Sequence, residues 1–108
     1  MGTESYVAVT PADAIDEKDF SCFQIDGMSI VICRLNDTYY ALKNECSHAL
    51  ATFEDGCMRG YRLICPRHSG AFDVRDGSPC AAPAKRPIRT FPVRVVNGVV
   101  EVDLSCAD

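Results

Sequence analysis

Two short segments that each pair a cysteine with a histidine constrain this chain more than any other feature. They are Cys46-Ser47-His48 and Cys65-Pro66-Arg67-His68, and they hold the only 2 histidines among 108 residues. Thiolate is a soft ligand and imidazole suits iron, copper or zinc, so two of each on paired loops indicate a transition-metal site. The candidate ligands are Cys46, His48, Cys65 and His68.

The rest of the composition is that of one soluble globular domain. Hydrophobic residues make up 47% of the 108 residues and charged residues 24%, which suits a single domain with a modest core. No apolar run reaches the length of about 18 residues that a membrane helix needs, and the first residues lack the features of a signal peptide. An excess of 15 acidic over 11 basic residues argues against nucleic acid as a partner. We therefore expect a cytoplasmic protein, and a monomer by default.

The 7 cysteines do not suggest a disulfide framework, because their number is odd, their spacing is irregular and no export signal precedes them. Cys22 and Cys33 fall in apolar, strand-like runs, where we expect them to be small buried hydrophobes. Cys57, Cys80 and Cys106 lie nearer to turns or to the end of the chain, where we expect partial exposure.

The flanks of the chain have the pattern of β-strands. Strands are predicted over residues 6–9, 21–25, 28–35, 38–42, 88–96 and 99–104, because β-branched residues dominate and no long 3.6-residue period is present. Asp26-Gly27, Asn36-Asp37 and Asn97-Gly98 are predicted hairpin turns between them. Thr10 is a predicted helix cap before Pro11, and the acidic run 13–19 a predicted solvated turn.

Residues 44–83 differ from these flanks, because they are rich in loops and contain both ligand pairs. Strand signals are short there, over 61–64 and 71–74. A segment with so little apolar surface is stabilised when a metal ties its loops together. We expect one all-β domain over 1–108, in which an antiparallel base from 1–43 and 84–108, resembling a sandwich or barrel, carries a metal-binding insertion at about 44–83.

The region from Cys46 through His68-Ser69-Gly70-Ala71-Phe72-Asp73 to Asp76-Gly77 resembles the cluster-binding region of Rieske-type ferredoxins. The resemblance continues through Pro87-Ile88-Arg89-Thr90-Phe91-Pro92 to the final hairpin, and it is strongest to the ferredoxins of bacterial aromatic-ring-hydroxylating dioxygenase systems. It implies a Rieske iron-sulfur domain with one 2Fe-2S cluster per chain. Cys46 and Cys65 would bind the inner iron and His48 and His68 the outer one, with residues 79–83 as a covering loop.

The same resemblance implies a one-electron carrier and not an enzyme. Its partners would be a flavin-dependent NAD(P)H reductase and the terminal Rieske oxygenase, which would dock transiently at the His48 and His68 tip. Ala49, Leu50, Pro66 and Pro83 are candidates for an apolar rim around that tip.

Two residues refine the subtype. Arg67 occupies the position where high-potential Rieske proteins have a disulfide cysteine, which implies a potential toward the bottom of the range of roughly −150 to +300 mV. Ser69 stands where many relatives have glycine, and two roles are open to its hydroxyl: contact with a sulfide, or exposure to water.

Three alternatives to this function are considered. A Cys₂His₂ set also suits structural zinc in an interaction module, but zinc modules favour C-x₂₋₄-C with H-x₃₋₅-H, and here each loop pairs one Cys with one His. Cys/His nucleophilic catalysis needs one pair only and leaves the second unexplained. A Rieske ferredoxin or small subunit of another redox system, such as a nitrite reductase, is the third.

Overall fold

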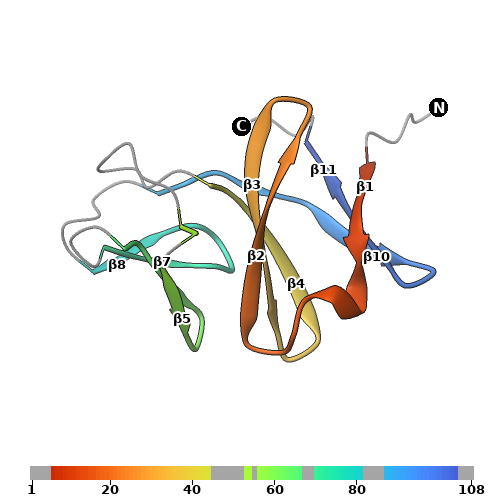
Figure 1. The fold of residues 1–108 in the computed structure, drawn as a ribbon. Helices are drawn as coiled ribbons and strands as arrows, with labels where there is room; N and C mark the ends of the chain where they lie inside the picture. Colours follow the sequence, from red (N-terminus) through yellow and green to blue (C-terminus); the bar gives the residue numbers. More distant parts are fainter. Residues whose placement is uncertain (1–5, 45–52, 55, 67–69, 82–86, 105–108) are drawn as a thin grey trace.

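The fold consists of antiparallel β-sheets. The computed structural model describes residues 6–44, 53–54, 56–66, 70–81 and 87–104. Within these ranges the chain forms strands β1 to β11 and one short 3₁₀ helix, and all the paired strands are antiparallel. The strands make three sheets, which lie next to one another in Figure 1. The predicted all-β class is confirmed.

The two ends of the described chain meet in a three-stranded sheet, called here the terminal sheet. Strand β1 (Tyr6–Pro11) pairs with β11 (Val99–Asp103), which also pairs with β10 (Val93–Val96). The predicted turn Asn97-Gly98 joins β10 to β11, with the positive φ angles of 52° and 76° that a tight hairpin requires.

The central sheet has the order β2-β3-β4-β9. Its strands are β2 (Asp19–Ile25), β3 (Met28–Leu35), β4 (Thr38–Lys43) and β9 (Thr90–Phe91). The two predicted hairpins that join β2, β3 and β4 are confirmed, and their turn residues at 26–27 and 36–37 all have positive φ.

Strand β3 is buried on both faces, which explains its almost unbroken apolar sequence. Ile32 faces a core that includes Val100 of the terminal sheet. Its neighbours Val31 and Cys33 face a second core that includes Phe72. Because successive side chains of a strand point to opposite faces, one strand can contribute to both cores. The central sheet is therefore the middle layer of the molecule.

The third sheet, called here the small sheet, covers the second core. It consists of β5 (Cys57–Arg59), β6 (Arg62–Ile64), β7 (Ala71–Asp73) and β8 (Pro79–Ala81), in that order. Strands β6 and β7 were predicted within one residue of their observed bounds. Strands β5 and β8 were not predicted, because neither contains a β-branched or aromatic residue, and β8 begins with a proline. Proline is acceptable there because β8 is an edge strand.

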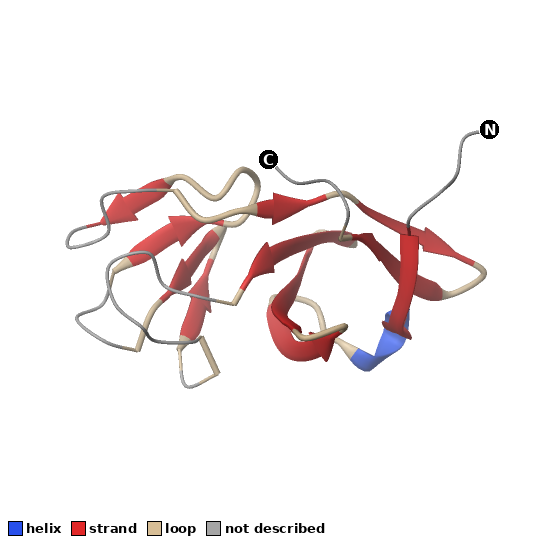
Figure 2. Cartoon of the chain, turned by 90° about the horizontal axis from the view of Figure 1, so that it is seen from above, coloured by secondary structure: helices blue, strands red, loops and turns tan. Residues whose placement is uncertain are grey.

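Two predictions at the flanks are wrong. The expected strand over 88–96 is divided at Pro92, so that β9 joins the central sheet and β10 the terminal sheet. Proline has no N–H for a strand ladder, which favours a change of sheet at that residue. Thr10 caps no helix: it is a buried residue of β1 whose hydroxyl donates to the Pro11 carbonyl, and the helix that follows is the 3₁₀ turn Ala12–Ala14 (blue in Figure 2).

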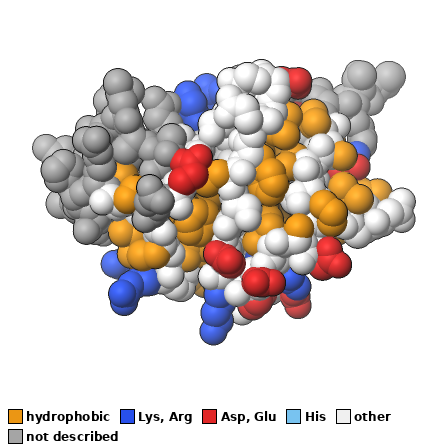
Figure 3. Space-filling model, viewed as in Figure 1, with side chains coloured by type: hydrophobic (Ala, Val, Ile, Leu, Met, Phe, Trp, Pro, Cys, Tyr) orange, Lys and Arg blue, Asp and Glu red, His pale blue; other side chains and the backbone are white. Residues whose placement is uncertain are grey.

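The acidic run after this turn is exposed, as predicted, but one of its residues also has a structural role. Asp13, Asp16, Glu17 and Asp19 are exposed, and Figure 3 shows acidic side chains gathered along one edge of the molecule. The carboxylate of Glu17 accepts the backbone N–H groups of the turn at 36–37. It therefore holds the β3–β4 hairpin in place. No helix in the described part of the chain is long and apolar enough to cross a membrane.

Candidate metal centre

Cys65 lies where the small sheet meets the second core. It directly follows β6, is only 1% exposed and packs in the core shared with the central sheet. The next residue, Pro66, is exposed, so the chain leaves the core at this point. The backbone N–H of Cys65 donates to the carbonyl oxygen of Gly70 at 2.7 Å, which joins the two ends of the second ligand segment. The prediction that a strand leads into this segment is confirmed.

The other three predicted ligands, Cys46, His48 and His68, lie outside the described residues. The same holds for Ser69, and for Ala49, Leu50 and Pro83 of the predicted rim. The structure does describe the residues that flank these segments on both sides. It therefore shows how the ends of each ligand segment are held.

The ends of the first ligand segment are joined by Asn44. This residue follows β4, precedes Cys46 by two positions and is only 3% exposed. Its side-chain Oδ1 accepts the backbone N–H of Phe53 at 2.8 Å, across the segment 45–52. Its Nδ2 donates to Ser29 Oγ at 2.9 Å and to Glu54 Oε2 at 3.2 Å. Sequence reasoning missed Asn44; the available signal was an asparagine at the end of a strand, just before the first candidate ligand.

The two ligand segments share one core at their bases. Phe53 directly follows the first ligand segment, is fully buried and belongs to the same core as Cys65. Its ring packs edge-on against Phe72 of β7, with ring centroids 5.8 Å apart and an interplanar angle of 88°. The small sheet and the central sheet thus position both segments jointly.

The predicted covering loop is in part a strand. Residues 79–81 form β8, which pairs with β7, whereas Pro83 lies outside the described residues. The turn before β8 depends on Gly77, whose φ is +80°. A Cβ atom at Gly77 would lie 2.1 Å from the carbonyl oxygen of Ile88, so only glycine fits this close approach. The chain on either side of residues 82–86 is therefore held together by β8 and Gly77.

Two of the other described cysteines, Cys22 and Cys33, are less suited to bind a metal. Cys33 is fully buried, and burial raises the pKa of its thiol well above the usual value. Burial, followed by the charge of Glu54, raises the pKa of Cys22 to about 11. Both thiols thus stay protonated near neutral pH, whereas a metal ligand must be a thiolate. The predicted core role is confirmed for Cys33, while Cys22 is only partly buried; Cys57 is exposed, Cys80 partly buried, and Cys106 outside the described residues.

A network of polar and aromatic side chains joins the small sheet to the central sheet. Arg75 donates from Nε and Nη2 to the carboxylate of Asp73 at 2.9 and 2.7 Å, and its guanidinium lies 4.1 Å from the ring centre of Tyr61. The Tyr61 hydroxyl accepts from Asn36 Nδ2 at 2.9 Å, and Tyr40 packs edge-on against the Tyr61 ring. The hydrogen bonds that Arg75 donates to the Asp73 carboxylate hold the pKa of Asp73 below its usual value.

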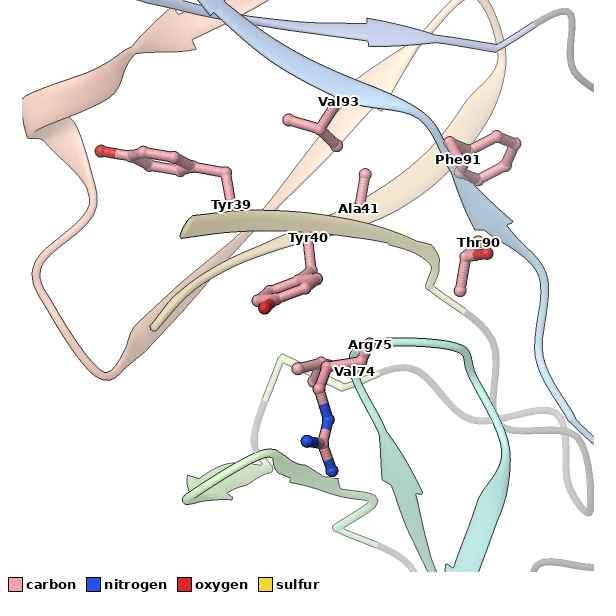
Figure 4. A pocket seen from close by; sticks show the side chains of 8 residues that line it. All are labelled: Tyr39, Tyr40, Ala41, Val74, Arg75, Thr90, Phe91 and Val93. Atoms are coloured by element: carbon pink, nitrogen blue, oxygen red, sulfur yellow. The ribbon is translucent and has the colours of Figure 1, made fainter. Parts of the chain in front are cut away.

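A shallow pocket lies beside this network. Figure 4 shows Tyr40 directed from β4 toward Val74 and Arg75, while Tyr39 and Val93 lie on the other side of that strand. The pocket contains one charged side chain, and that side chain is already bound to Asp73. Its lining therefore offers no cysteine, histidine or carboxylate for a metal.

The chemistry of Cys65 fits an iron-sulfur cluster. Clusters of this type are bound by cysteine thiolates, and solvent exposure is one of the factors that set their potential. Cys65 offers its sulfur from an almost fully buried residue, at the point where the chain turns outward. The hydrogen bond to Gly70 holds the backbone of Cys65, so the position of this residue at the end of β6 is fixed.

Comparison with known proteins agrees with this assignment. Residues 5–92 match the family model described as the Rieske [2Fe-2S] domain. The chain is 36% identical over 97 residues to the anthranilate 1,2-dioxygenase ferredoxin subunit of Burkholderia cepacia, a match that covers 87% of this chain and 90% of the relative.

Solved structures of ferredoxins have the same fold. The ferredoxin of carbazole 1,9a-dioxygenase from Nocardioides aromaticivorans superposes with a TM-score of 0.87 and 34% identity, over 92% of this chain and 97% of that one. A chain from the complex of reduced oxygenase and oxidized ferredoxin in carbazole 1,9a-dioxygenase gives a TM-score of 0.87 at 28% identity, over 94% of each chain. The family model spans most of the chain, so the protein belongs to the Rieske [2Fe-2S] family: it is a ferredoxin that binds a Rieske cluster, an electron carrier and not a catalytic enzyme.

Proposed function

We propose that this ferredoxin carries single electrons from a flavin-dependent NAD(P)H reductase to the terminal oxygenase of a ring-hydroxylating dioxygenase system. The observation that carries the proposal is the similarity, over 87% of this chain, to a protein named as a dioxygenase ferredoxin subunit. It is supported by the similarity to a chain from a complex of oxygenase and ferredoxin. A Rieske cluster supplies the chemistry, because it takes up and releases one electron at a time.

Four residues would hold the cluster: Cys46 and Cys65 at the inner iron, His48 and His68 at the outer iron. The burial of Cys65 supports its place at the inner iron, since a ligand for the iron nearer the protein must come from the core. The family match favours this set over a zinc site, because Rieske centres replace two cysteines by two histidines on one iron.

The insertion of about 44–83 in a base from 1–43 and 84–108 is proposed as the structural division behind this function. It is supported by the small sheet, whose four strands pair only with one another among the described residues. The base and the insertion share the second core, and the insertion would present the histidines.

We further infer that partners dock at the His48 and His68 tip. Pro66 is exposed directly after buried Cys65, which supports its place in the apolar rim proposed with Ala49, Leu50 and Pro83. An electron carrier must leave its partners quickly, which favours a contact of less than about 1,200 Å² in total. The cytoplasmic location and the monomeric state stay predictions.

The experiment that tests the proposal begins with the purified protein. We expect a red-brown colour and, after reduction, a rhombic EPR signal with an average g value below that of the free electron. Stoichiometric zinc in a colourless protein would contradict the cluster. Serine substitution of Cys65 should abolish the signal, whereas serine substitution of exposed Cys57 should leave it unchanged.

The partner is tested by reconstitution. A flavin reductase, this ferredoxin and a ring-hydroxylating oxygenase should together turn over NADH with formation of a dihydrodiol, and omission of the ferredoxin should stop turnover. If Leu50→Lys leaves the rate of electron transfer unchanged, the rim is wrong. Turnover only with a nitrite reductase would favour the alternative redox system instead.

A further inference from the structure

Asn44 lies at the base of the first ligand segment. Among the buried polar side chains of the described residues, it makes the most hydrogen bonds. Thr10 and Asn44 are the buried polar residues in the described part of the chain. The hydroxyl of Thr10 makes one local bond of 3.3 Å to the neighbouring carbonyl. Asn44, by contrast, uses both its amide oxygen and its amide nitrogen in bonds to residues 9 to 15 positions away.

These bonds connect three parts of the chain at one point. The Asn44 backbone N–H donates to the carbonyl of Ser29 at 2.9 Å, and its Nδ2 bonds to the hydroxyl of the same residue. Asn44 is thus held at the start of β3, while Oδ1 holds the backbone of Phe53. The side chain therefore closes the segment 45–52 and attaches it to the central sheet.

The arrangement is specific for an amide. A carboxylate at this position would keep the acceptor for Phe53 N–H, and the Ser29 hydroxyl can rotate to donate to it. It would lose the donor toward Glu54 and put two carboxylates together. An apolar residue would leave the buried N–H of Phe53 without its acceptor.

We propose that Asn44 is a positioning residue for the cluster: it joins both ends of the segment that contains Cys46 and His48, and so determines how firmly these two ligands hold the cluster. This inference rests on the proposed ligand set. Asn44 has its effect through the backbone of Phe53 and through Ser29.

The test is a charge-swap cycle in the purified, cluster-loaded protein. The readouts are the rate at which a chelator removes the visible absorbance, the g values and line width of the reduced EPR signal, and the reduction potential. For N44D we expect cluster loss at least about tenfold faster, the size of effect expected when a hydrogen bond to a charged group, here Glu54, is lost, together with a changed EPR signal.

E54Q alone should be close to the parent protein, because its amide oxygen still accepts from Asn44. In N44D/E54Q the donor and the acceptor exchange sides, so the double variant should recover most of the parent rate and signal. N97D is the matched control, since it makes the same change in an exposed hairpin turn where aspartate is acceptable, and it should have no effect.

Several results would overturn the inference. One is N44D that loses its cluster at the parent rate with an unchanged signal. Another is N44D with a lower melting temperature but parent g values and potential, because this would indicate a purely structural role. A double variant as impaired as N44D would also contradict it.

If N44D does not fold, hydrogen exchange in the parent protein tests the inference instead. Fast exchange at the Phe53 amide would exclude its hydrogen bond to Asn44 Oδ1 and so overturn the inference. Absence of a Rieske signal from the parent protein would count against the proposed function. A normal parent signal with an unaffected N44D would count against this inference alone.

Discussion

The central and small sheets reach order in different ways. Strands β2 and β3 are paired over seven successive residues, from Asp19 with Arg34 to Ile25 with Met28. The strands of the small sheet have three residues each, and β5 and β6 share three pairs. The central sheet is therefore stabilised mainly by its own ladder and by cores on both faces. The small sheet depends on one shared core and on single contacts at its edges.

This difference indicates what a cluster-binding region made of short strands needs in order to fold. Long ladders form from local hairpins, whereas short strands need partners from elsewhere in the chain. In this protein those partners are the second core, the bonds of Asn44, the close approach at Gly77 and the Arg75 network. Three substitutions with matched controls test this comparison.

The largest effect is expected from the core of the small sheet. Phe72→Ala removes a fully buried ring that packs against Phe53, so it should lower the free energy of unfolding by about 3–5 kcal/mol. Phe91→Ala, in the core shared with the terminal sheet, is the matched control and should have a loss of about the same size. Denaturant unfolding measures both.

Hydrogen exchange then distinguishes the two regions. Phe72→Ala should increase exchange in β6 and β7 while β1 and β11 stay protected, and Phe91→Ala should do the reverse. If both variants increased hydrogen exchange in the small sheet equally, the two cores would unfold as one cooperative unit, and the proposed difference between the sheets would be wrong.

A smaller effect is expected at Gly77. Gly77→Ala forces a Cβ atom to within 2.1 Å of the Ile88 carbonyl oxygen, in addition to the strain of its positive φ. Gly27→Ala is the control, because Gly27 has nearly the same φ of +79° and nothing within 4 Å of an added Cβ. The control should lose about 1–2 kcal/mol from φ alone, and Gly77→Ala about 1–3 kcal/mol more. Thermal unfolding of the two proteins compares them, and equal losses would mean that the close approach is relieved without cost.

The smallest effect is expected from the Arg75 network, and it depends on pH. Asp73 has a lowered pKa in the folded protein because Arg75 donates to its carboxylate, so this pair stabilises the fold above the unfolded pKa of Asp73. That stabilisation is lost as the pH falls through the lower, folded pKa. Arg75→Ala should therefore be less stable than the parent at neutral pH, with a difference that becomes smaller in acid as the part due to Asp73 is lost.

An NMR titration of the Asp73 carboxyl measures the cause directly. Its pKa should rise toward the ordinary value in Arg75→Ala and stay low in Arg59→Ala, a change at another exposed arginine of the same sheet. An unchanged pKa in Arg75→Ala would show that the bond to Asp73 does not persist in solution.

The parts of the fold that were predicted correctly are those encoded locally. The turns at 26–27, 36–37 and 97–98 carry residues that accept positive φ, and apolar strands flank each of them. Strand β3 was therefore predicted with its observed bounds. Strands β5 and β8 were missed because they contain no β-branched or aromatic residue, and the division at Pro92 depends on which sheet each side joins.

The candidate site shows the same contrast. Cys65 was predicted as a ligand from its spacing to His68, and the thiols of Cys22 and Cys33 were separated from the candidate ligands by their apolar neighbours. Asn44 was missed because its partners lie 9 to 15 residues away, and no local pattern connects them.

The sequence by itself determined the kind of metal site, the family and the hairpins, because ligand chemistry and turn geometry depend on residue type and short spacing. Only the tertiary structure decided that one strand, β3, supplies two cores, that the small sheet rests on the second of them, and that Asn44 joins the ends of the first ligand segment. The reason is physical: burial and closure of a segment depend on which distant residues meet, and that is settled only when the sheets pack together.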